Sequence, residues 1–227
     1  MASPTLLFER TRQAIESNDV VAFDRWTKHP RWRRSPEWDE AWAHAALRAA
    51  CCTEWLQRME GLGVSLLSGY RQPLLCEAAR TNNTAAMEWL LNKGADVETV
   101  SDYGLGATAG YYALKAGATE ALELMWKKTG RVWSLVGPSR FSAWVRPESL
   151  PVLEHMARCG WSPDDLEVSR SNPDGQSFRQ RLADQDAPAP PSLCAWLESS
   201  RLDGALARPG QTPASASNQS AKPRARL

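Results

Sequence analysis

The stretch PLLCEAARTNNTAAMEWLLNKGADV, residues 73–97, decides the fold because it encodes two short helices and the turn between them. The alanine pair 78–79 lets the first helix approach a partner closely, and the asparagine pair 82–83 suits a tight turn, since asparagine tolerates left-handed backbone geometry. Apolar residues at 86–91 then fall on one helical face, and Gly94 ends the second helix without a Cβ penalty. The stretch therefore predicts a helical hairpin.

The same pattern of an apolar helical segment followed by a helix breaker returns along the chain. The intervals between successive breakers are 33, 31, 36 and 30 residues, because the breakers are Pro30, Gly63, Gly94, Gly130 and Gly160. A period of about 33 residues is typical of stacked helix pairs. The chain is therefore predicted to be a repeat protein.

Residues 73–97 resemble an ankyrin repeat. Their A-A-x-x-N-N and L-L-x-x-G-A-D-V are similar to the A-A-x-x-G-H and L-L-x-x-G-A-D-V-N of that family. Residues 106–126 resemble a second repeat that keeps the G-x-T opening and the inter-helix glycine, although Ala109 and Gly110 replace the family's Pro-Leu. The resemblance implies an all-α, ankyrin-like solenoid of helix-turn-helix repeats with short finger loops.

Outside residues 73–130 the resemblance weakens, and the remaining units are inferred from the period. We expect an N-terminal cap over 6–26 with a turn at 17–19, and a helix pair without a clear turn signal over 38–59. A degenerate unit whose helices are shaped by Pro147 and Pro151 is expected over 141–160, and a last pair interrupted at 187–191 over 176–202. About five helix pairs would then form one domain over 1–203. Residues 204–227, rich in Ala, Pro, Ser and Gln and free of acids, are predicted to be a disordered tail.

Composition sets limits on the partners of this 227-residue chain. A hydrophobic content of 43% and a charged content of 23% fit a globular protein. Twenty-seven basic and 26 acidic residues leave a net charge of +1, so we expect no nucleic-acid partner. The basic stretch 28–34 is neutralised locally by the acids that follow it at 37–40 and is interpreted as a solvated loop. The 11 tryptophans are interpreted as bulky core residues.

Cysteine usage and hydropathy favour a cytoplasmic protein. The five cysteines are odd in number and lack paired spacing, Glu9 and Arg10 interrupt any N-terminal signal sequence, and no apolar run approaches the length of about 18 residues that a membrane span requires. We therefore expect no membrane span and a cytoplasmic location. Delivery without a cleaved signal peptide stays open.

The sequence offers few residues for chemistry, and we predict no catalytic residue, cofactor or metal. The glycines of 104–110 lack the strand that precedes a nucleotide-binding loop and are interpreted as a finger loop. None of the three histidines, His29, His44 and His155, is placed within metal-ligand spacing of a cysteine or of another histidine. Cys159 lies one helical turn after His155 and would allow a Cys–His nucleophile, but a small residue at a helix end is the preferred interpretation.

The predicted function is non-catalytic protein–protein interaction through the concave face of the stack. Tyrosine and arginine are enriched at binding hot spots, and all four tyrosines lie between 70 and 112. The candidate partner-binding residues are Tyr70, Arg71, Asp102, Tyr103, Tyr111, Tyr112 and Arg140. Two alternatives stay open: a dedicated neutraliser or effector that inhibits or recruits one target enzyme, and an enzyme that uses Cys159 or the glycine loop.

Overall fold

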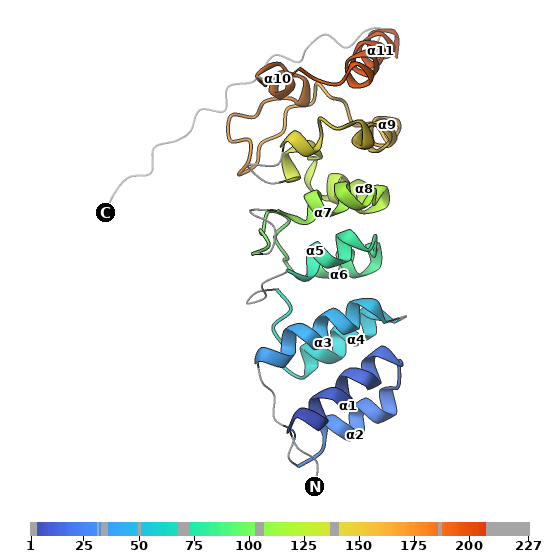
Figure 1. Ribbon diagram of the computed structural model, residues 1–227, viewed down its shortest axis with the longest axis vertical. Helices are drawn as coiled ribbons and strands as arrows, with labels where there is room; N and C mark the ends of the chain where they lie inside the picture. The colour runs from blue at the N-terminus through green and yellow to red at the C-terminus, as the bar shows by residue number, and fades with distance from the viewer. Residues whose placement is uncertain are drawn as a thin grey trace, which may run out of the picture.

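The structure is a computed structural model that describes residues 4–30, 32, 36–49, 51–67, 73–102, 107–136, 141–185 and 188–207. Over these ranges the chain forms helices joined by loops, with isolated β-bridges and no β-strand. The prediction of an all-α fold is therefore confirmed. Figure 1 shows the helices stacked one above another in a column, with the first helix at one end and the last at the other.

Helical hairpins build the N-terminal two thirds of the column. They pair α1 Pro4–Glu16 with α2 Val20–Thr27, α3 Pro36–Arg48 with α4 Cys52–Gly61, α5 Leu74–Arg80 with α6 Thr84–Asn92, and α7 Ala109–Ala116 with α8 Thr119–Thr129. Each hairpin coincides with a segment that the sequence assigns to a helix pair. The helix pair expected over 38–59 forms in spite of its weak turn signal.

The turns inside the hairpins use the residues that the sequence predicts. Asn18 and Asn82 have φ values of 55° and 54°, in the left-handed region that asparagine tolerates, and the equivalent turn residue between α7 and α8 is Gly117. Asp19 and Asn83 follow directly, and each accepts a hydrogen bond from the backbone N–H three residues later, which caps the second helix. The turn and the cap are thus encoded together in two adjacent residues.

The C-terminal third is less regular. It contains the 3₁₀ turns η1 Trp133–Val136, η2 Phe141–Ala143 and η3 Pro147–Ser149, followed by α9 Leu150–Arg158, α10 Phe178–Ala183 and α11 Pro191–Ala207. In the unit expected over 141–160, two 3₁₀ turns stand in place of the first helix, and Pro151 lies in the first turn of α9. Helix α11 runs four residues past the domain boundary predicted at 203. Residues 208–227 of the predicted tail lie outside the described residues.

The hairpins pack in two rows. The first helices, α1, α3, α5 and α7, contact one another in sequence order, and so do the second helices α4, α6 and α8, which continue into α9. Small side chains permit the closest approach: Ala78 and Ala79 on α5 and Ala109 and Ala113 on α7 are all buried. One continuous hydrophobic core results, and it runs through the described residues from α1 to α11.

The tryptophans fill this core, as predicted. All 11 lie in the described ranges and none is classed as exposed. The deepest, each at most 2% exposed, are Trp42, Trp55, Trp133, Trp144 and Trp161. Several stack against other rings, for example Trp42 against Trp32 with their centroids 5.8 Å apart. The aromatic side chains therefore contribute to packing between units more than to the surface.

The loops that join one hairpin to the next lie along one side of the column (Figure 1). After α6, an antiparallel bridge between Ser101 and Ala107 closes a short finger, with the Ser101 N–H donating to the Ala107 carbonyl at 2.8 Å. After α9, the longer segment 162–177 carries the bridges Leu166–Ser177 and Ser169–Asn172. We call this side, formed by 62–67, 95–101 and 162–177, the finger side.

Candidate functional site

Three of the seven predicted partner-binding residues lie in the described chain. Asp102 is exposed and directly follows the bridge residue Ser101, and Tyr111 and Tyr112 lie in the first turn of α7. The Thr108 hydroxyl accepts a hydrogen bond from the Tyr111 N–H and so caps the N-terminus of the helix that carries both rings. The other four, Tyr70, Arg71, Tyr103 and Arg140, lie outside the described residues.

The two tyrosine rings differ in what they contact. They meet edge to face, with centroids 5.8 Å apart and planes at 75°, and both are half-buried. The Tyr112 hydroxyl donates to Ser101 Oγ at 3.4 Å, so this ring joins α7 to the finger. Tyr111 instead lines an open hollow of about 520 Å³ together with Lys115, Gly117 and Glu148. Of the pair, Tyr111 is the ring that lines this hollow.

A second hollow, of about 380 Å³, opens on the finger side. Val100 and Leu135 give it an apolar floor, and Glu98 and Arg170 line it with opposite charges. Val100 is 45% exposed, as is Leu67 in the preceding finger, and the two lie 33 positions apart. Sequence analysis missed this pair, although each is an apolar residue a few positions after the glycine that ends its unit, Gly63 or Gly94.

Charged and polar groups hold the loops of the finger side in place. Arg131 pairs with Glu98, whose other carboxylate oxygen accepts from the backbone N–H of Arg170 at 3.0 Å. Glu167 is 1% exposed and accepts hydrogen bonds of 2.9 Å from the backbone of Val132 and Ser134. Burial raises the pKa of Glu167, against the opposing effect of these donors. These contacts join the loops of the finger side beside the hollow to one another.

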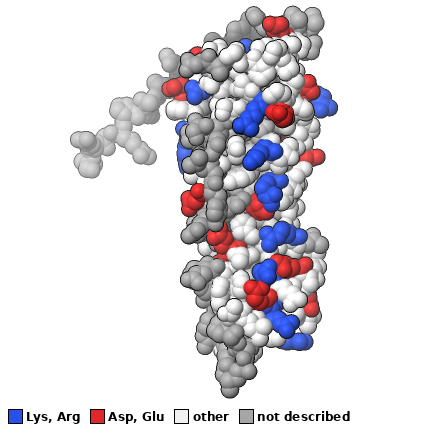
Figure 2. All heavy atoms as spheres, in the orientation of Figure 1, with Lys and Arg blue, Asp and Glu red and all other residues white. Residues whose placement is uncertain are grey.

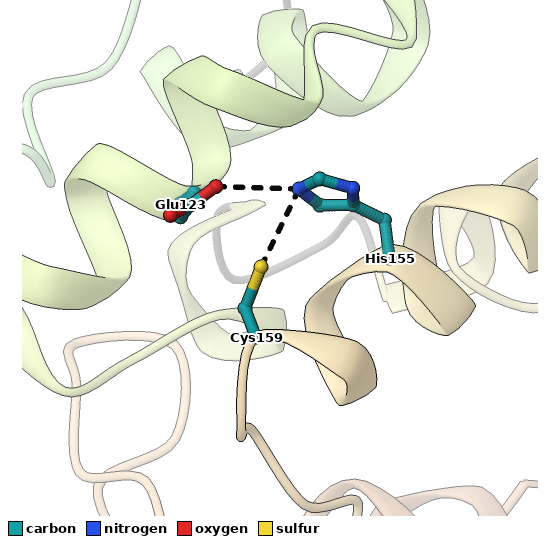
Figure 3. A group of neighbouring side chains, drawn as sticks. All are labelled: Glu123, His155 and Cys159. Atoms are coloured by element: carbon teal, nitrogen blue, oxygen red, sulfur yellow. Dashed lines mark hydrogen bonds and ion pairs between the residues drawn. The ribbon is translucent and has the colours of Figure 1, made fainter.

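A separate cluster joins the second row of helices at α8 and α9, where Glu123, His155 and Cys159 converge (Figure 3). His155 Nε2 lies 3.3 Å from Glu123 Oε2 and 3.5 Å from Cys159 Sγ. His155 lies in α9 and Cys159, one turn later, is the residue that directly follows this helix, so both face α8, and all three side chains are partly exposed. The positively charged end of Lys127 lies 2.5 Å from Glu123 Oε1.

The electrostatics of this cluster oppose nucleophilic catalysis. Hydrogen bonds from Lys127 and then His155 lower the pKa of Glu123. Partial burial and then the Glu123 carboxylate raise the pKa of Cys159, so the thiol is kept protonated. A catalytic cysteine needs the opposite shift. The geometry of a Cys–His pair is present, but the environment does not activate it.

The cluster corrects one step of the sequence analysis. His155 and Cys159, four residues apart on a helix, do have metal-ligand spacing, and the statement that no histidine has it is wrong for His155. The third member, Glu123, comes from the preceding unit at a separation of 32 residues. A search for metal ligands a few residues apart in the sequence does not include such a distant residue, although the repeat period of about 33 residues does place Glu123 opposite His155.

Charges on the visible face of the column are mixed in sign. Figure 2 shows Lys and Arg side chains along the column with Asp and Glu between them. Ion pairs join successive units: Arg58–Asp24 at 3.5 Å, Lys93–Glu60 at 2.8 Å and Lys128–Glu88 at 3.9 Å. The described residues of this face therefore form no band of one sign that would attract a polyanion.

These features define an all-α protein built of stacked helical hairpins, with loops gathered on one side. No protein-family model matches the chain, and no curated protein or solved structure shows significant similarity to it. Among the described helices, none combines the length and the apolar character that crossing a membrane would require.

Proposed function

We propose that the chain is an ankyrin-like solenoid that binds a protein partner without catalysis. The observation that carries the proposal is the spacing of the hydrogen bonds between units. Between the hairpins from α1/α2 to α7/α8 they join residues 31 to 39 positions apart, for example Cys52–Asn83, Lys93–Glu60, Trp55–Asn18 and Asn82–Ala121. The segment 162–177 departs from this spacing, because Arg170 bonds to Glu98, 72 positions earlier. Contacts confined to neighbouring units are the property that distinguishes a solenoid from a closed globule.

The distribution of exposed apolar side chains supports binding on the finger side. Six large hydrophobic residues of the described chain are notably exposed, and four of them lie in the finger-side loops: Leu67, Val100, Leu166 and Val168. Apolar side chains gathered on one side of a molecule mark an interaction surface more often than scattered ones do. The finger side, with the hollow beside Val100, is therefore where we place the partner.

The predicted tyrosines fit the same proposal. Tyr111 lies on α7 and lines the hollow formed with Arg146 and Glu148. Thr108, which caps the same helix, lines the finger-side hollow at Val100. Tyrosine loses little conformational entropy on binding and contributes a large contact area. Hydrogen bonds of Glu98 and Glu167 already join the loops beside the finger-side hollow, and a surface formed before docking loses less conformational entropy on binding.

The test starts with affinity purification on the full chain, identification of a stoichiometric partner, and calorimetry with the purified pair. A double variant with Val100→Asp and Tyr111→Ala should weaken binding by about thirtyfold or more, since a hot spot contributes about 2 kcal/mol. Val21→Asp is the matched control, because Val21 is 71% exposed on α2, away from the fingers. Both proteins should keep the helical circular dichroism of the parent. Binding that survives the double variant would discard the proposed surface.

A further inference from the structure

We propose that Glu123, His155 and Cys159 form a binding site for one Zn²⁺ ion that joins α8 to α9. Each residue contributes one ligand atom: a carboxylate oxygen, Nε2 and Sγ, all within 4.8 Å of one another. Figure 3 shows that the carboxylate comes from one helix and the other two groups from the next. The site is thus built between two repeat units and is independent of the finger side.

The distances agree with tetrahedral zinc coordination. Bond lengths of about 2.0 Å to imidazole and carboxylate and about 2.3 Å to thiolate, at the tetrahedral angle, place the ligand atoms about 3.3 Å apart for N and O and about 3.5 Å apart for N and S. The corresponding separations are 3.3 Å between His155 Nε2 and Glu123 Oε2, and 3.5 Å between His155 Nε2 and Cys159 Sγ. Two of the three separations thus match a tetrahedral zinc site, and the third pair, the Glu123 and Cys159 ligand atoms, lies within 4.8 Å.

Hydrogen bonds join the same three groups in the metal-free protein. His155 Nε2 lies within hydrogen-bond distance of Glu123 and of Cys159, and the Cys159 thiol also bonds to Glu123. A bound cation would replace these hydrogen bonds, and the thiol would lose its proton.

The donor set selects zinc among common metal ions. Mg²⁺ and Ca²⁺ require oxygen ligands, whereas thiolate with imidazole and carboxylate suits Zn²⁺. Three protein ligands leave the fourth position to water, and the site is accessible because the Glu123 and His155 side chains are 24% and 28% exposed. Such an open site is expected to bind more weakly than a closed four-ligand structural site.

Lys127 acts as a positioning residue for the carboxylate. Its ammonium group holds Glu123 Oε1 at 2.5 Å, which leaves Oε2 directed toward His155. Ligating carboxylates are commonly fixed by an outer hydrogen bond of this kind. The charge of Lys127 also repels a bound cation, but the side chain is 62% exposed, so water and salt screen this repulsion.

Zinc binding at this site is expected to release a proton from Cys159 and to strengthen as the pH rises. The charged groups that face the thiol are Glu123 and Lys127 from α8 and Arg158 from α9. Burial and the Glu123 carboxylate keep the pKa of this thiol raised in the metal-free protein. Competition between the proton and the metal therefore extends to higher pH than at an isolated cysteine.

The experiment titrates Zn²⁺ into the full-length, metal-free protein under a reductant that does not bind metal, in competition with a chromophoric chelator. One equivalent should bind. Cys159→Ser, His155→Ala and Glu123→Gln should each weaken binding by at least about tenfold, since loss of even an outer-shell group costs about 10–100-fold. Cys51→Ser and Cys194→Ser are matched controls, because both thiols are exposed and neither belongs to the cluster.

Co²⁺ provides a second readout that does not depend on stability. A site of this composition should give the intense visible bands of tetrahedral Co²⁺ together with a thiolate charge-transfer band, and Cys159→Ser should abolish the latter. Zn²⁺ should also raise the thermal midpoint of the parent protein and of the two controls, but not that of Cys159→Ser. Binding that is absent, that is unaffected by Cys159→Ser, or that gives an octahedral Co²⁺ spectrum would overturn the proposal.

Discussion

The side chain of Asn82 caps a helix that belongs to the next repeat unit. Its Oδ1 accepts a hydrogen bond of 3.0 Å from the backbone N–H of Ala121, in the first turn of α8. The capping position of α8 is occupied by Ala118, which has no side-chain acceptor. Asn18 makes an equivalent link, because its Oδ1 accepts from Trp55 Nε1 at 2.7 Å in the following hairpin. Both asparagines thus form a left-handed turn and join two units.

This double role predicts the outcome of two substitutions at position 82. Asn82→Gly keeps the left-handed turn but removes the cap of α8, and should lower the free energy of unfolding by about 1 kcal/mol. Asn82→Ala removes the cap as well, and unlike glycine it keeps a Cβ in the left-handed region without the polar group by which asparagine tolerates it, so it should be about 1–2 kcal/mol less stable than Asn82→Gly. Urea unfolding of both variants checks the order. Equal stability of Asn82→Gly and the parent would show that the link to Ala121 contributes nothing.

At Gly110, where α7 meets η1, any added side-chain atom is expected to disturb packing. A Cβ at this position would lie 2.5 Å from the carbonyl oxygen of Leu135, which is backbone and cannot rotate away. Gly110→Ala should therefore lower the free energy of unfolding by about 1–3 kcal/mol, as overpacking does. Gly61→Ala in α4 is the matched control, since nothing lies within 4 Å of its added Cβ, and a gain of up to about 1 kcal/mol is expected there.

A destabilised Gly61→Ala, or a Gly110→Ala protein as stable as its parent, would contradict this account. Thermal unfolding followed by circular dichroism measures both. The result also bears on the glycines at 104–110. Of these, Gly110 lies in the first turn of α7 and is required for close packing, which is a structural reason for glycine that needs no phosphate ligand.

Much of the fold is readable from short-range signals in the sequence. The asparagine turns at 18 and 82 and the glycine turn at 117 were all predictable, because each combines a residue that accepts left-handed geometry with a helix-forming segment on either side. The segment 162–177 was not predicted. Its conformation depends on contacts of Glu167 and Ser169 with Ser134, 33 and 35 residues earlier, which no local pattern encodes.

The candidate sites divide in the same way. Tyr111 and Tyr112 were both predicted from composition and their place at the start of a helix, but the direction of Tyr112 toward Ser101 is set by tertiary packing that the sequence does not show. The partnership of Glu123 with His155 requires knowledge of which faces of α8 and α9 meet. A site built from residues of two units can be predicted only when it is known which residue of one repeat lies opposite which residue of the next.

Replacing Glu167 with glutamine, which is nearly isosteric, is expected to lower the free energy of unfolding. Its Oε1 accepts from the Val132 N–H and the Trp161 indole, and its Oε2 accepts from the Ser134 N–H, each at 2.9 Å. In Glu167→Gln an amide NH₂ must replace one of these oxygens and then faces a donor. We expect a loss of about 1–3 kcal/mol in the free energy of unfolding, measured in urea, the cost of a buried unsatisfied group.

The matched control for this change is Glu148→Gln in η3, since Glu148 is exposed at the protein surface. It should change the free energy of unfolding by less than about 0.5 kcal/mol. If both variants lose the same amount, the three hydrogen bonds of Glu167 do not hold the segment 162–177 against η1.

Glu77 predicts an acid-dependent contribution to stability. Hydrogen bonds from Arg80, 2.6 and 2.9 Å long, lower the pKa of Glu77, so the native state binds the proton less tightly than the unfolded chain. The stabilisation is present above the pKa of the unfolded chain and is lost as pH falls through the native pKa. Glu77→Gln should therefore cost up to about 1 kcal/mol at neutral pH, since Arg80 is half-exposed, and nothing in strong acid.

Urea midpoints of the parent and Glu77→Gln across the acid range measure this difference. Glu198→Gln, at an exposed position of α11, serves as the control and should follow the parent at every pH. A difference between parent and Glu77→Gln that stays constant as the pH falls would assign the effect to packing and not to the charge.

Cys159 predicts slow alkylation in the metal-free protein. Burial and the Glu123 carboxylate raise the pKa of this thiol, so little reactive thiolate forms at neutral pH, and the midpoint of its pH–rate profile should lie above that of an ordinary cysteine. Glu123→Gln removes the negative charge and should shift this midpoint to lower pH and speed the reaction. Mass spectrometry after timed iodoacetamide treatment in a chelator measures each cysteine separately. Faster labelling of Cys159 than of the exposed Cys51 and Cys194 would instead reveal an activated thiolate, and would revive the enzymatic alternative.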